Sequence, residues 1–136
     1  MANFESRVQW KRASEEFPGN PFWGLRGITP IDVRQGAVGD CWFMVAASAL
    51  AEQPDRLEKI FLNVSGETNM NGIYGVNLYA LGVPHTVVVD DYLPLQEVKQ
   101  SDGTNKYQTL FAHFTDDQSM WNVILEKAMA KLHGNY

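Results

Sequence analysis

The chain has 136 residues, 45% of them hydrophobic, and a formal net charge of −5 at pH 7, which predicts a folded globular domain. The acidic balance argues against nucleic acid and anionic membranes as main partners, since both attract positive charge, and no apolar run approaches the roughly 20 residues of a membrane span. A single cysteine excludes an internal disulfide and a multi-thiolate metal site, so we expect a reducing, cytoplasmic setting.

Residues 1–30 are predicted to form an irregular entry segment. Prolines and glycines interrupt any periodicity there, from Pro18 to Pro30. Aromatic residues are spread through the same segment, so we expect it to pack against a core.

Two helices are expected next, within residues 40–63. The first begins at Cys41, runs to about Gln53 and is apolar on nearly every face, which is typical of a buried central helix. Pro54 is expected to end it. A short second helix is predicted over 55–62.

Residues 72–114 are predicted to hold strands. Alternating apolar residues favour a strand over 72–81, a turn at 82–84, a strand over 85–89 and a further strand over 107–114. The pair Asp90-Asp91 is expected to cap a turn rather than to bind a metal.

The last predicted element is an amphipathic helix over 118–133, with apolar residues at helical spacing and Gly134 placed to end it. Asp116 and Asp117 are expected to cap its N-terminus. The element order predicts an α+β fold, mainly helical, with a small antiparallel sheet, rather than a doubly wound sheet.

The most informative segment runs from Gln35 to Trp42. It places Cys41 where a glycine-rich loop meets the first helix, and the unpaired N–H groups of a helix N-terminus favour a thiolate. The side-chain amide of Gln35 can donate a hydrogen bond to a developing oxyanion. A buried, inert cysteine is the alternative interpretation.

This segment, Gln-Gly-Ala-Val-Gly-Asp-Cys-Trp-Phe, resembles the active-site segment of calpain-type cysteine proteases, within the papain-like group. Asp40, directly before the cysteine, is the residue that calpains carry there. Further matches follow in the family's order at Trp10-Lys11-Arg12 with Glu15, at 87–91 with Leu93-Pro94, and at Trp121 with 125–128. The whole of 1–136 therefore resembles a single domain, the N-terminal subdomain of the two-part calpain protease core.

The resemblance implies roles for several residues. Cys41 would be the nucleophile, and Gln35 with the backbone N–H of Cys41 would form the oxyanion hole. Gly36 and Gly39 would allow tight loop geometry beside the substrate, and Trp42 would pack at the helix start.

The rest of the catalytic machinery is expected to lie elsewhere. In papain-like enzymes the histidine and asparagine follow the cysteine by roughly 130–150 residues, beyond Tyr136. His85, His113 (in a probable edge strand) and His133 are predicted to be structural or surface residues. We therefore expect a second subdomain to supply both groups. We also expect the substrates to be proteins, and we expect no turnover by this chain alone.

Two other functions stay open. A non-catalytic calpain-like binding or scaffolding module would keep the fold without the chemistry. A papain-fold acyltransferase, such as a transglutaminase, shares the leading cysteine, but the calpain-like flanking segments argue against it.

The resemblance also implies a possible calcium site. Leu25 and Gly27 would supply backbone carbonyls and Asp32 a carboxylate. The second carboxylate is expected at the position that Ser119 occupies, and a hydroxyl carries no charge.

Two departures from the family pattern therefore argue against calcium binding. Ser119 is the first, and Pro30, where calpains commonly carry an arginine, is the second. Asp116 or Asp117 could compensate only if the loop before the last helix is rearranged.

Overall fold

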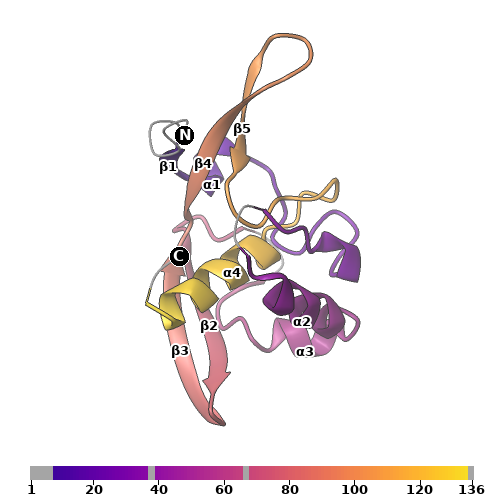
Figure 1. Cartoon of the computed structure of the whole chain (residues 1–136). Coiled ribbons are helices and arrows are strands. Elements are labelled where there is room, and N and C mark those ends of the chain that lie inside the picture. The colour runs from indigo at the N-terminus through magenta and orange to yellow at the C-terminus, as the bar shows by residue number, and fades with distance from the viewer. Residues whose placement is uncertain (1–7, 37–38, 66–67, 135–136) are drawn as a thin grey trace.

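The computed structural model describes residues 8–36, 39–65 and 68–134. Helices and strands take similar shares of these residues, so the α+β class is confirmed but the expectation of a mainly helical chain is wrong (Figure 1). In chain order the elements are β1 (Val8–Arg12), α1 (Ala13–Glu16), the 3-10 turn η2 (Pro30–Asp32), α2 (Cys41–Ala51), α3 (Pro54–Glu58), β2 (Ile73–Ala80), β3 (Val83–Asp90), β4 (Tyr92–Lys99), β5 (Asn105–Thr109) and α4 (Trp121–Leu132).

The entry segment is more regular than expected. Residues 1–7 lie outside the described part, but 8–16 form β1 and the single turn of α1. The expectation of an irregular segment is wrong here because β1 is held by antiparallel pairing with β4, some eighty positions along the chain, with Trp10 opposite Pro94. The expected packing is confirmed, since Phe22 is fully buried.

The strands form two antiparallel sheets instead of one. One sheet has the order β1-β4-β5, and β2 and β3 form a separate hairpin that turns at Leu81-Gly82 rather than at 82–84. The two hairpins project toward opposite ends of the molecule (Figure 1). Strand β4 was not predicted, and it contains Pro94, which lacks an N–H. The predicted strand over 107–114 is shifted, since β5 ends at Thr109.

Helix α2 begins at Cys41 as predicted, but it is not buried on every face. Phe43 and Met44 lie in the core, whereas the side chains of Trp42 and Val45 are 61% and 69% exposed. No described element covers that second face. Pro54 does not end α2 but begins α3, at a first-turn position where its missing N–H is not needed.

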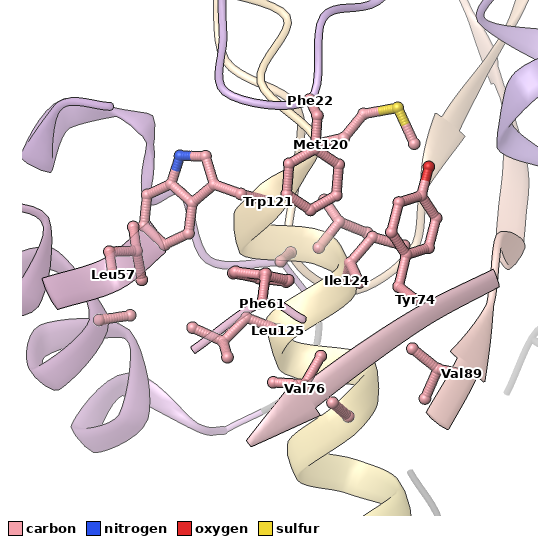
Figure 2. Close-up of a cluster of buried hydrophobic side chains, with 14 of the residues drawn as sticks. Phe22, Leu57, Phe61, Tyr74, Val76, Val89, Met120, Trp121, Ile124 and Leu125 are labelled. Atoms are coloured by element: carbon pink, nitrogen blue, oxygen red, sulfur yellow. The ribbon is translucent and has the colours of Figure 1, made fainter. Parts of the chain in front are cut away.

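Helix α4 runs through the centre of the core (Figure 2). Its start at Trp121 is fixed by the carbonyl of Phe22, which accepts hydrogen bonds from the N–H groups of Met120 and Trp121, both at 3.0 Å. The expected caps, Asp116 and Asp117, are therefore wrong, because a distant carbonyl takes their place. Gly134 follows the helix with a φ of 113°, as its predicted role requires.

The helices and the β2–β3 hairpin share one core. Buried side chains of α4 meet the hairpin on one side and α3 on the other (Figure 2). The chain after α3 also pairs with β2, through Leu62 N–H donating to Gly75 O at 2.9 Å. No helix in the described ranges is long and apolar enough to cross a membrane.

Candidate active site

Cys41 is the first residue of α2, and its side chain is exposed. Asp40 is the N-cap residue, and its carbonyl accepts the N–H groups of Phe43 at 2.8 Å and Met44 at 3.1 Å. Trp42 lies next to the cysteine and meets Phe43 edge-on at 5.9 Å between ring centroids. The thiol is therefore accessible and stands on a helix whose first turn is anchored in the core.

The loop that carries Gln35 is fixed against the segment 110–113. His113 N–H donates to Arg34 O at 2.8 Å, and a Cβ added to Gly36 would lie only 1.5 Å from Phe111 O. The tight geometry expected at Gly36 is thus present. A Cβ at Gly39 would meet nothing within 4 Å, and residues 37–38, which join this loop to Asp40, lie outside the described part.

Side chains of α4 hydrogen-bond to the same segment, 110–113. Ala112 N–H donates to Glu126 Oε2 at 2.9 Å, and Asn122 Nδ2 donates to His113 O at 3.2 Å. The pKa of Glu126 is raised to about 8, chiefly by burial and in addition by the hydrogen bond and charge of Asp40, while the Ala112 N–H opposes the shift. The loop, the 110–113 segment, α4 and the start of α2 therefore form one connected structure.

Glu126 is the residue of this site that sequence reasoning missed. It is only 3% exposed although it is an acid in an amphipathic helix. A signal was present: Asn122 and Glu126 are four residues apart, so they share one row of the helix surface, and their neighbours Leu125 and Ala128 are apolar.

None of the three histidines hydrogen-bonds to Cys41. His85 is exposed on β3, and His133 follows α4 with its Nδ1 2.9 Å from Met129 O. The pKa of His113 is lowered by burial, with a contribution from the charge of Arg34. His113 is not in an edge strand as expected, because β5 ends before it.

The carboxylate expected to bind calcium is already satisfied within the protein. Asp32 is fully buried; Thr29 N–H donates to its Oδ2 at 2.8 Å and Thr29 Oγ1 to its Oδ1 at 2.9 Å. Trp121 Nε1 donates to Oδ2 at 3.3 Å. Asp32 thus completes the capping box that Thr29 begins at η2, and it links this turn to α4.

The other expected calcium ligands are backbone carbonyls and a hydroxyl, which carry no net charge to offset that of the ion. Leu25 and Gly27 lie in the loop before η2, and Ser119 Oγ is buried with no hydrogen-bond partner in the described residues. Asp117 could compensate in charge, but its Oδ1 accepts the Arg26 Nε at 2.9 Å and both its oxygens accept the Arg26 N–H. Within the described ranges, no cluster of three or more His, Cys, Asp or Glu side chains suited to a metal occurs.

Comparison with known proteins identifies the family. A model described as "Calpain family cysteine protease" matches residues 1–136. Calpain-13 of Rattus norvegicus is 35% identical over 131 residues, which are 96% of this chain and 18% of that protein. The calpain-2 catalytic subunit of Homo sapiens is 35% identical over 130 residues (95% of this chain, 17% of that protein), and calpain-A of Drosophila melanogaster is 31% identical over 133 residues (97% and 15%). The chain thus spans less than a fifth of these relatives, and it belongs to the calpain family of cysteine proteases.

Proposed function

We propose that this chain is the nucleophile-bearing half of a calpain-type cysteine endopeptidase. Cys41 attacks a peptide carbonyl, and the Gln35 side chain with the Cys41 N–H stabilises the tetrahedral oxyanion; the C–N bond then breaks, the amine product leaves with a proton, and an acyl-enzyme remains. The observation that carries the proposal is the exposed thiol at the first residue of α2. The loop of Gln35, fixed against 110–113, supports the second role.

The histidine and asparagine of the catalytic machinery would come from a second, papain-like subdomain, on a longer parent chain or a separate one. The exposed face of α2, with Trp42 and Val45, suits contact with another protein surface beside the nucleophile. Protein substrates would then bind between the two subdomains, and the chain alone would not turn over. The single cysteine favours a cytoplasmic location.

The reactivity of the thiol tests the role of Cys41. We expect Cys41 to react with iodoacetamide at neutral pH several-fold faster than an exposed thiol elsewhere on the same helix, because the helix N-terminus favours negative charge on sulfur. The rate can be followed by mass spectrometry of the intact chain.

The matched control is Cys41→Ala combined with Val45→Cys, since Val45 is exposed one turn along α2. Equal rates for the two thiols would contradict an activated nucleophile. That outcome would favour the second candidate, a non-catalytic calpain-like binding module, which the neutral Ser119 and the engaged Asp32 also favour.

We also propose that calcium binds this chain weakly or not at all. The carboxylate of Asp32 accepts three internal hydrogen bonds, and the charge of Asp117 is balanced by Arg26. Isothermal titration with calcium should show no micromolar binding. Micromolar binding that is lost in Asp32→Ala would contradict this.

A further inference from the structure

Two carboxyl groups meet where the start of α2 packs near α4. Asp40 directly precedes the cysteine, Glu126 is almost fully buried in α4, and the two side chains are hydrogen-bond neighbours. Asp40 Oδ1 and Glu126 Oε1 are both buried and have no donor among the described residues. Two ionised carboxylates can only accept, so this contact requires a proton on one of them.

We propose that Asp40 and Glu126 share one proton in a carboxyl–carboxylate hydrogen bond that positions the residue before the nucleophile. The positioning role rests on the function proposed above for Cys41, whereas the shared proton does not. Asp40 and Glu126 are positioning residues here, because neither touches the reacting atoms.

The contacts of Glu126 explain how its side chain can position Asp40. Its Oε2 accepts the Ala112 N–H at 2.9 Å, so Oε1 is the buried oxygen that has no donor among the described residues. Glu126 therefore links α4 both to the segment that supports the Gln35 loop and to the N-cap of α2. Loss of the proton would place two negative charges together in a buried site, which is strongly unfavourable.

The surrounding groups leave Asp40 as the dominant charge. The elements packed around Glu126 also carry Cys41 on α2, His113 on the 110–113 segment, Arg34 on the adjoining loop, and Lys127 on α4. Among the ionisable side chains of the described residues, Asp40 alone contributes to the raised pKa of Glu126, together with burial.

The sign of the pH dependence follows from the raised pKa. Between the ordinary glutamate pKa of 4.5 and about 8, the folded chain binds this proton and the unfolded chain does not. The contribution of the pair to the free energy of unfolding is therefore fully present at low pH and is lost as pH rises to about 8. One such proton changes the unfolding equilibrium constant by about tenfold per pH unit.

The variant Glu126→Gln tests the shared proton. Its amide N–H donates to Asp40 at every pH, and its oxygen can still accept the Ala112 N–H. Both proteins can be unfolded with denaturant between about pH 5 and about pH 8. The ratio of the wild-type unfolding equilibrium constant to that of Glu126→Gln should rise by up to about tenfold per pH unit. The control Glu58→Gln, an exposed glutamate of α3, should follow the wild type.

A second variant keeps the test independent of how well glutamine fits. Asp40→Asn supplies a donor from the other side, so it should also reduce the pH dependence while keeping the chain folded. Parallel pH profiles for the wild type and either amide variant would overturn the proposal. A constant offset at all pH values would also overturn it, because a merely structural role does not titrate.

The positioning role has its own readout. In the wild type, the rate of Cys41 alkylation against pH should show an added inflection where Glu126 titrates, and Glu126→Gln should lack it. Identical profiles would overturn the positioning role. If the stability profiles differ as expected but Cys41 reacts like an ordinary exposed thiol, the shared proton stands and the function proposed for Cys41 fails.

Discussion

At the scale of single residues, the site depends on a close approach between two backbones. Gly36 lies against the carbonyls of Leu110 and Phe111, so the loop that carries Gln35 has no room for a side chain there. The sequence signalled this position, since a glycine beside a candidate oxyanion donor indicates tight packing. It could not reveal the contacting partner, because Phe111 is far away along the chain.

Gly36→Ala should therefore destabilise the chain. Its Cβ would lie 1.5 Å from Phe111 O and 2.7 Å from Leu110 O, both main-chain atoms that cannot simply rotate away. We expect the free energy of unfolding to fall by about 1–3 kcal/mol or more in denaturant titrations.

The matched control is Gly39→Ala in the same loop. A Cβ there meets no atom within 4 Å, so the free energy of unfolding should change by no more than about 0.5 kcal/mol. Equal losses for the two variants would contradict the packing account of Gly36.

At the scale of elements, helices were predicted better than strands. The spacing in α4 and the apolar run of α2 are local signals, and both helices lie close to their expected positions. Strands β1 and β4 stabilise each other across most of the chain, and neither has a strong pattern alone. Their junction depends on Asp91, which sequence analysis assigned with Asp90 to a turn.

Only Asp90 takes the expected turn role. Asp90 Oδ1 accepts the Tyr92 N–H at 3.1 Å, whereas Asp91 is fully buried. The Asp91 carboxylate accepts Arg12 Nε at 3.0 Å and the Ser14 N–H at 3.1 Å. It therefore joins the end of β1 and the start of α1 to the β3–β4 connection.

Asp91→Ala should loosen that junction. The partly buried Arg12 Nε and Ser14 N–H would lose their acceptor, and a buried hydrogen-bonding group left unsatisfied costs up to about 1–3 kcal/mol of unfolding free energy. Thermal unfolding followed by circular dichroism measures the loss.

The surface pair Lys11–Glu16, with both side chains partly exposed, offers the control. Glu16→Gln should change the melting temperature little, because exposed ion pairs contribute little to stability. A melting temperature of Asp91→Ala equal to that of Glu16→Gln would contradict the structural role of Asp91.

At the scale of the whole molecule, one apolar face of α2 lies outside the core. The composition of α2 predicts a helix buried all round, yet Trp42 and Val45 face outward beside Cys41. The apolar run of α2 does not encode which of its residues lie outside the core, so this part of the fold could not be predicted. The Cys-Gln motif, by contrast, is local, and it predicted both the start of α2 and the family.

The proposed function makes Cys41 a working nucleophile whose base lies on a second subdomain. The most direct test is casein hydrolysis by this chain, alone and mixed with the second protease subdomain of a calpain relative. We predict no hydrolysis by the chain alone, hydrolysis in the mixture, and none in the mixture with Cys41→Ala. Hydrolysis by the chain alone that Cys41→Ala abolishes, or hydrolysis in the mixture that survives Cys41→Ala, would contradict the account.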